Sequence, residues 1–349
     1  MSDAPSDDER RPRVVTLGGG HGQAALLGAL AGLACDLTAV VSVADDGGCS
    51  GKLRRELGIP PPGDVRRCLA TVGRRRGPAE LLERRIERGR AAGRSVGNLA
   101  LAELTLERGG LTTAAQRVAD LLAAAATVLP VADTPATLAV YDLDRGHVHG
   151  ESRIEAESSN AVVATVHGPE RATEAAKAAI LDADVLLFGP GSFVGSTLAV
   201  LATADVAEAV ASSRARRILV RNVARDEHTN VPGAVPFDDH ERLFRDHLVI
   251  GSLGVPVRFD VLVDDPEAGV SLRDDGSREL RFPLADAAGR RHEPALLRAG
   301  LAAHLGLAGR RADTPSRDTQ DDASAEACHA LAELATRALA RLGLPALDG

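Results

Sequence analysis

The sequence predicts an α/β protein in which a mainly parallel sheet is covered by helices on both faces. Short apolar runs that read as buried strands alternate along the chain with longer stretches rich in Ala, Leu and Val. This alternation is typical of parallel strands joined by helices. The chain has 349 residues, of which 44% are hydrophobic, so it can bury a substantial core.

The first unit predicts a strand, a helix and a second strand. Val14–Leu17 and Leu37–Val43 are β-rich, and Leu26, Leu30 and Leu33 between them follow helical spacing. Six further runs indicate buried strands: Thr127–Val131, Thr137–Leu143, Ala161–Val166, Val185–Phe188, Arg217–Val220 and Phe259–Val263. Three stretches between them indicate helices: Thr112–Ala126, Glu170–Leu181 and Ser196–Ser212.

Two segments depart from this alternation. Tyr141–His149 predicts a β-hairpin that turns at Asp144–Gly146 and adds antiparallel strands at an edge. Arg74–Arg94 carries eight arginines with glutamates interleaved three or four residues apart. This pattern favours a solvated, ion-paired helix, and the alternative is a lid that faces an anion.

The chain divides into four predicted parts. Residues 1–12 are mostly charged or Pro/Ser and predict a disordered tail. Residues 13–309 form the predicted ligand-binding domain, and residues 310–323 are polar and indicate a linker. The final part, residues 324–349, contains a predicted helix over Ser324–Leu342.

Composition excludes several classes of function. The net charge is −8 and only 2% of residues are aromatic, which argues against binding nucleic acid. No apolar run is long enough to span a membrane, and the N-terminus is charged where a signal peptide is apolar. The four cysteines form no C-x-x-C pair, so we expect a reducing, cytoplasmic location and no structural zinc.

Two glycine-rich loops follow predicted strands and are candidates for binding a phosphate. Gly18–Gln23 opens the first helix, and Gly189–Ser196 follows a later strand. Ligands of open α/β sheets bind at the carboxyl ends of strands, where glycine lets backbone N–H groups approach an anion. The alternative is a tight turn that needs small residues. The first loop lacks the G-x-G-x-x-G dinucleotide fingerprint, and Ser192 lacks the G-x-S-x-G elbow of a nucleophile.

Carboxylates follow the second strand. Asp45 and Asp46 could bind a divalent cation beside a diphosphate, accept a proton from a hydroxyl, or hydrogen-bond a sugar. The alternative is a structural Asx-turn. Asp64 is expected to cap a helix unless its loop faces the ligand, and Asn98 either offers an amide to a ligand or acts as an N-cap. His147 and His149 on the hairpin are interpreted as facing solvent.

The order of these segments resembles one family. The chain reads GGGHG, VADDGGCSGKLRRELGIPPPGDVRRCL, VGNL, VLP followed by ADT, DADVLLFGPGS and RNV. From about Arg13 to about Val263 this order resembles the gluconeogenesis factor family, the YvcK-like branch of the CofD-like superfamily. The block Val41–Cys68 is the most specific part.

The resemblance implies a Rossmann-like fold and a cytoplasmic regulator that binds a UDP-sugar, notably UDP-N-acetylglucosamine. Such regulators are linked to gluconeogenic growth, cell shape and cell-wall precursor supply. The resemblance implies a protein partner in amino-sugar or cell-wall metabolism and no required cofactor, and we expect a homo-oligomer. The related CofD enzymes transfer a phospholactyl group from a nucleotide diphosphate donor with magnesium. The alternative is therefore a magnesium-dependent transferase, with Asp45 or Asp46 as metal ligand or base.

The motif match also implies the ligand-binding residues. They lie in the two glycine loops and in the polar loops between them: Gly18, Gly19, Gly20, His21, Gly22, Gln23, Asp45, Asp46, Gly47, Gly48, Ser50, Gly63, Asp64, Asn98, Gly189, Pro190, Gly191, Ser192 and Asn222. The chain departs from the family at Gln23–Ala24, where relatives have Leu-Ser, and at Cys49, where they usually have Ser. After Asn222 the family usually has a segment with a tyrosine near its end, whereas Val223–Asp239 here contains no tyrosine. The departure implies that the recognised base can differ.

Overall fold

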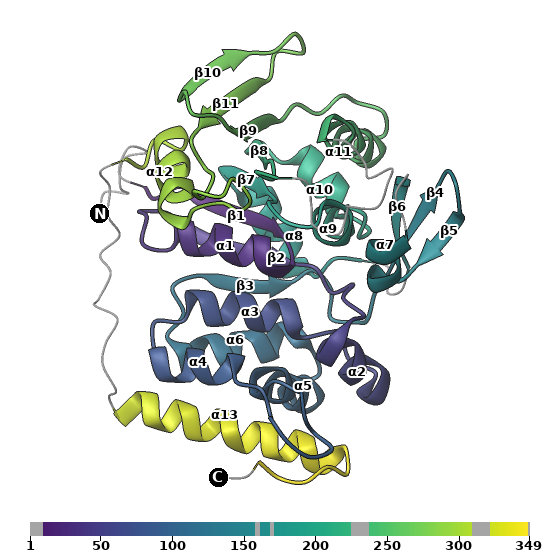
Figure 1. Cartoon of the computed structure of the whole chain (residues 1–349), viewed down its shortest axis with the longest axis vertical. Helices are drawn as coiled ribbons and strands as arrows, with labels where there is room; N and C mark the ends of the chain where they lie inside the picture. The colour runs from purple at the N-terminus through teal and green to yellow at the C-terminus, as the bar shows by residue number, and fades with distance from the viewer. Residues whose placement is uncertain (1–9, 158–160, 168–170, 225–236, 309–321, 348–349) are drawn as a thin grey trace, which may run out of the picture.

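The fold is built on one large sheet (Figure 1). The computed structural model describes residues 10–157, 161–167, 171–224, 237–308 and 322–347. Eight strands pair in the order β10-β11-β9-β8-β7-β1-β2-β3, and every pair is parallel except β10–β11. The predicted parallel sheet is therefore confirmed. The strands are β1 (Arg13–Gly18), β2 (Asp36–Val41), β3 (Thr127–Pro130), β7 (Val185–Phe188), β8 (Arg216–Val220), β9 (Asp260–Asp264), β10 (Gly269–Leu272) and β11 (Arg278–Phe282).

Helices cover both faces of this sheet. One group contains α1, α3 and α12, which contact one another through α1, and a second group contains α8, α9, α10 and α11. Both α1 and α8 contact the central strand β1. The helices are α1 (Gly20–Leu30), α2 (Gly48–Leu57), α3 (Gly63–Val72), α4 (Arg76–Glu83), α5 (Val96–Arg108), α6 (Leu111–Leu122), α7 (Glu151–Glu157), α8 (Glu174–Asp182), α9 (Ala199–Leu201), α10 (Val206–Ser212), α11 (Phe237–Gly251), α12 (Pro294–His304) and α13 (Asp322–Arg341).

The core lies between the sheet and these helices. The side chains of Val14, Leu17 and Phe188 are completely or almost completely buried. Strands buried on both faces read as continuous apolar runs, which is why the runs in the sequence located them well. No helix in the described ranges has by itself the length and hydropathy of a membrane span, although the bent pair Phe193–Leu201 and Val206–Ser212 meets that criterion jointly.

The predicted hairpin belongs to a second, small sheet. β4 (Thr137–Asp142) pairs antiparallel with both β5 (Gly146–His149) and β6 (Ala161–His167). This three-stranded sheet is separate from the large one, and Figure 1 shows it to one side with α7 beside it. The antiparallel edge of the large sheet is instead β10. The hairpin turn itself is confirmed at Gly146, which has a φ of 72°.

Two predicted helices are shorter than expected. The arginine-rich stretch is helical only in α4, which ends at Glu83 because Arg84 adopts an extended conformation. Gly89 and Gly93, with φ values of 75° and 82°, lie in the loop that follows. The stretch Ser196–Ser212 is broken into a π-helix, η1 (Phe193–Leu198), then α9 and α10. The break before α10 coincides with Asp205, whose φ is 70°.

The C-terminal helix α13 packs across α5 and α4 (Figure 1). Glu103 of α5 is buried, and its carboxylate pairs with Arg337 and with Arg341 at 2.6 Å. Apolar residues of α2, α5 and α13 form a second hydrophobic cluster there. The predicted tail and linker lie largely outside the described residues, so the predicted division of the chain into parts stays a prediction.

Candidate ligand-binding site

A cavity of about 660 Å³ opens at the carboxyl ends of the parallel strands. It contains most of the sequence-predicted site residues, which come from loops after β1, β2, β7 and β8 and from the start of α3. It also contains residues that the sequence did not indicate. The lining residues are Gly19, Gly20, His21, Gly22, Ala25, Asp45, Gly47, Asp64, Arg67, Glu151, Ser152, Glu155, Pro190, Gly191, Ser192, Ser196, Asn222, Val223, Ala224, Arg290, Arg291 and His292.

The two glycine loops touch each other across this cavity. Gly19 is the N-cap of α1, and Gly20 has a φ of 63°. A Cβ on Gly22 would lie 2.6 Å from the Cα of Gly191 and closer still to the carbonyl of Pro190. Only glycine permits this approach. The N-terminus of α1 therefore faces the second loop, as a phosphate cradle requires.

Asn222 holds the second loop in place. Its Oδ1 accepts a hydrogen bond from Gly191 N, and its Nδ2 donates to Gly191 O, both at 2.9 Å. Ser192 is the N-cap of η1, and its Oγ accepts a hydrogen bond from Gly195 N at 3.0 Å. Asn222 thus fixes the loop backbone that would contact an anion.

Asp45 forms the Asx-turn that was one alternative, and it also lines the cavity. Its Oδ1 accepts a hydrogen bond from Gly47 N at 2.8 Å. Burial raises its pKa to about 6, and the neighbouring carboxylate of Asp64 adds to this shift. An acid with this pKa can accept or release a proton near neutral pH.

Asp46 has a different function in the structure. Its Oδ1 accepts a hydrogen bond from Ser152 N at 2.9 Å, although the two residues are 106 positions apart. The carboxylate therefore binds the N-terminus of α7, an arrangement that a helix dipole favours. Asp46 is not among the cavity-lining residues.

The cavity also contains positive charge close to the first loop. Asp64 does not cap α3, whose N-cap is Pro62; its Oδ1 pairs instead with Arg67 at 2.8 Å. Burial and the nearby Arg67 guanidinium lower the pKa of His21. The N-terminus of α1 likewise disfavours the cationic form of this imidazole.

Several predicted residues are placed behind the lining. Gln23 is buried and its Nε2 donates to Thr16 O and Val40 O at 3.2 and 3.0 Å, so its amide faces the sheet rather than the cavity. Ser95, not Asn98, is the N-cap of α5, and Asn98 Nδ2 lies 3.5 Å from Ser50 Oγ. Gly18, Gly48, Gly63 and Gly189 are likewise absent from the lining.

Two walls of the cavity were not predicted. Glu151, Ser152 and Glu155 come from α7, and Arg290, Arg291 and His292 come from the loop before α12. The Arg290–His292 wall follows no predicted strand. The α7 wall follows the predicted hairpin, which was expected at an edge of the sheet rather than at the ligand site. The only signal available was composition: a Gly-Glu-Ser sequence after the hairpin and an Arg-Arg-His sequence before a helix.

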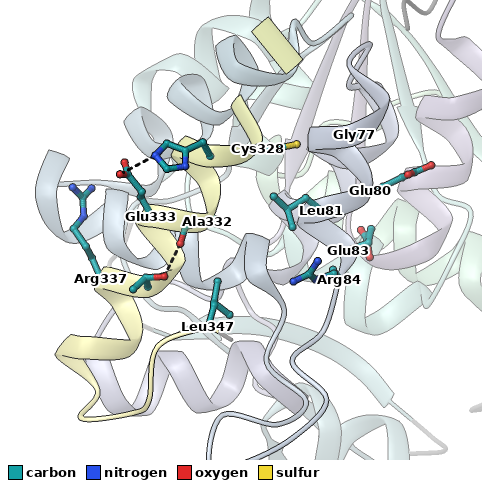
Figure 2. Close-up of a pocket in the computed structure, with 12 residues that line it drawn as sticks. Gly77, Glu80, Leu81, Glu83, Arg84, Cys328, Ala332, Glu333, Arg337 and Leu347 are labelled. Carbon is teal, nitrogen blue, oxygen red and sulfur yellow. Dashed lines mark hydrogen bonds and ion pairs between the residues drawn. The ribbon is translucent and has the colours of Figure 1, made fainter. Parts of the chain in front are cut away.

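A larger hollow lies elsewhere, between α4 and α13. It has a volume of about 1190 Å³ and is lined by residues that include Leu81, Arg84 and Cys328. Figure 2 shows that these side chains come from α4 and the adjoining Arg84, from α13, and from Leu347 near the end of the chain. None of the predicted site residues lines it, so it is a separate feature of the helical layer.

Comparisons with known proteins show the family of this chain. Residues 14–271 match the family model described as 2-phospho-L-lactate transferase CofD. The gluconeogenesis factor of Halalkalibacterium halodurans is 35% identical over 279 residues, which cover 79% of this chain and 84% of that protein. This chain belongs to the CofD-like gluconeogenesis factor family. Because the family match ends at residue 271, the Arg290–His292 wall lies outside the matched region.

This chain aligns with a smaller part of other relatives in the gluconeogenesis factor family. A putative gluconeogenesis factor of Deinococcus radiodurans is 33% identical over 84% of this chain, and the match spans 66% of that protein. A match from Nostoc spans 48% of its protein. A crystal structure of a UPF0052 family protein from Bacillus halodurans has a TM-score of 0.71, with 28% identity over 84% of this chain and 99% of that chain.

Proposed function

We propose that this gluconeogenesis factor family member binds a nucleotide sugar, UDP-N-acetylglucosamine, and regulates other proteins without consuming it. The observation that carries the proposal is the contact between the Gly19–Gly22 and Pro190–Ser192 loops across a cavity that has both carboxylates and guanidinium groups. A volume of about 660 Å³ lies in the range of small-ligand sites.

Each part of the cavity suits a different part of such a ligand. The backbone of the two loops and the N-terminus of α1 suit a diphosphate. Arg67, Arg290 and Arg291 supply positive charge that pairs well with phosphate oxygens. The carboxyl groups of Asp45 and Glu151 suit the hydroxyl groups of a ribose or a sugar, since both form hydrogen bonds with hydroxyl groups.

The regulatory role is supported by the names of the relatives, which are gluconeogenesis factors. We propose that the ligand-bound protein contacts an enzyme or a cell-wall synthesis protein in the cytoplasm and affects carbon metabolism, cell shape and the supply of wall precursors. We also propose that it acts as a homo-oligomer, without nucleic acid or membrane as partner.

A second candidate function is a magnesium-dependent transferase that acts on a nucleotide diphosphate donor. It is favoured by the description of the matching family model and by the pKa of Asp45, which burial raises to about 6. In the described ranges no three His, Cys, Asp or Glu side chains are grouped to hold a metal ion. Magnesium is usually held by one or two carboxylates plus substrate phosphates, so Asp45 and Asp64 fit it. Bound magnesium would neutralise the diphosphate.

Calorimetry followed by mass spectrometry of the bound nucleotide separates the two functions. We expect binding of UDP-N-acetylglucosamine and recovery of the intact ligand after prolonged incubation with magnesium. Failure to bind any UDP-sugar would overturn the regulator proposal. Consumption of the ligand would favour the transferase, and Asp45→Asn would then retain binding and lose turnover.

A further inference from the structure

The wall formed by α7 contains an acidic side chain without a partner. Glu151 is half-buried where it lines the cavity, and within the described residues its carboxyl group has no protein hydrogen-bond or ion-pair partner. A carboxyl group forms hydrogen bonds through both of its oxygens. A carboxyl that faces a ligand cavity without a protein partner is therefore available to a polar group of the ligand.

The position of Glu151 shows which part of the ligand it meets. A Cβ on Gly195 would lie 2.7 Å from Glu151 Oε1 and 2.8 Å from Ser192 Oγ. The carboxyl thus lies beside the first turn of η1, at the end of the second glycine loop. A ligand bound by this loop would therefore have the α7 residues as a neighbouring wall of the same cavity.

Asp46 holds Glu151 in this position. Its Oδ1 accepts a hydrogen bond from Ser152 N at 2.9 Å, and the preceding Gly150 has a φ of 92°. A Cβ on Gly150 would collide with Asp46 Oδ2. Gly150 therefore allows the β2–α2 loop and the start of α7 to meet, and the contact directs Glu151 into the cavity.

We infer that Glu151 is the specificity-determining residue for the sugar of the nucleotide sugar, and that Asp46 is its positioning residue. Glu151 exchanges hydrogen bonds with sugar hydroxyl groups and leaves the phosphates to the glycine loops. This inference rests on the proposed function, because it assigns one wall of the same cavity to the sugar.

The electrostatics favour a hydroxyl partner over a cation or a phosphate. Burial raises the pKa of Glu151 well above its ordinary value, and the nearby Asp64 and Asp45 add to the shift. A protonated carboxyl both donates and accepts hydrogen bonds, as a sugar hydroxyl does. The raised pKa favours this protonated form, which repels an adjacent diphosphate less than an ionised carboxylate does.

The test compares two probes, UDP and UDP-N-acetylglucosamine, by calorimetry with and without MgCl₂. We expect Glu151→Ala to weaken binding of UDP-N-acetylglucosamine about tenfold, equivalent to one lost hydrogen bond to a buried group, and to leave the affinity for UDP within about twofold. Glu151→Gln should retain most of the preference for the sugar, because an amide also donates and accepts. The matched control is Glu157→Ala, which removes the same side chain from α7 at its ion pair with Arg153.

Asp46→Asn tests the positioning role. We expect it to reduce the ratio of the two affinities as Glu151→Ala does, and the double variant to lose no more than either single variant. This ratio would not change if Asp46 only stabilised the fold, since UDP binding reports folded protein. Separate effects that add in the double variant would overturn the positioning role.

The outcomes distinguish the inference from the proposed function. If the unmodified protein binds neither probe, the proposed function fails and the inference fails with it. If it binds both probes and Glu151→Ala leaves their ratio unchanged, the inference is wrong and the proposed function stands. If Glu151→Ala weakens both probes equally, or only in MgCl₂, Glu151 acts on the diphosphate or on a cation, and the inference is again wrong.

Discussion

Replacing Gly22 with alanine should separate the two glycine loops and abolish ligand binding. The added Cβ would lie 2.6 Å from Gly191 Cα and closer to the Pro190 carbonyl. Carbon atoms in contact are normally 3.5–4.0 Å apart, so one loop must move by about 1 Å. All the obstructing atoms belong to the backbone, which cannot rotate away as a side chain can.

The expected magnitude follows from this movement. Overpacking of this kind typically costs about 1–3 kcal/mol of unfolding free energy. A shift of about 1 Å also removes hydrogen bonds from both loops to a bound phosphate, each worth about 1.5–3 kcal/mol when the partner is charged. We therefore expect Gly22→Ala to lower affinity for UDP-N-acetylglucosamine at least about a hundredfold, measured by calorimetry, and to lower stability in urea unfolding.

Gly28→Ala is the matched control on the same helix. Its Cβ would meet only Thr71 Cγ2 at 3.6 Å, an ordinary contact. Alanine is a better helix former than glycine by about 1 kcal/mol, so we expect this variant to be equally or more stable and to bind normally. If Gly22→Ala unfolds and binds as Gly28→Ala does, the loops do not touch and the reasoning is refuted.

Three further predictions concern single residues of the site. Burial raises the pKa of Asp45 to about 6, so the affinity for UDP-N-acetylglucosamine should increase as pH falls from 7.5 to 5.5, because protonation removes a negative charge near the diphosphate. In calorimetry the Asp45→Asn variant should lose most of this pH dependence. An unchanged pH dependence in the variant would contradict the role of Asp45. The side chain of Asn222 makes two hydrogen bonds at 2.9 Å, so Asn222→Ala should reduce the free energy of unfolding in urea by about 2 kcal/mol, at about 1 kcal/mol per bond. The same variant should bind UDP-N-acetylglucosamine more weakly. Normal affinity would contradict the positioning role of Asn222. The amide of Gln23 faces the sheet, so Gln23→Met should reduce the free energy of unfolding by about 1–3 kcal/mol and leave the affinity of the folded protein for UDP-N-acetylglucosamine unchanged. A loss of affinity in calorimetry without a loss of stability would contradict this placement.

The sequence predicted the parts of the site that lie directly after buried strands. Parallel strands covered on both faces are continuous apolar runs, so β1, β2 and β7 and the loops that follow them could be located. The carboxyl ends of such strands share one edge. Gly19, Asp45 and Ser192 consequently lie together although they are far apart in the chain.

The sequence could not predict which way a side chain turns once its loop is placed. Gln23 is adjacent to a lining residue, yet its amide satisfies two carbonyl groups of the sheet because helix geometry turns it inward. Asp46 is adjacent to Asp45, yet it binds the N-terminus of α7. Glu151 was missed for the complementary reason: its wall reaches the cavity through a contact across 106 positions, which no local pattern records.

The small sheet of β4, β5 and β6 places the α7 wall on a separate unit from the strands that hold the glycine loops. The chain enters it after β3 and leaves it before α8, so it forms an insertion in the large sheet. Substitutions and length changes in this insertion can reshape the α7 wall while the glycine loops, held by β1 and β7, keep their geometry. The wall that would contact the group attached to the phosphates can therefore change while the loops that would bind the phosphates stay the same.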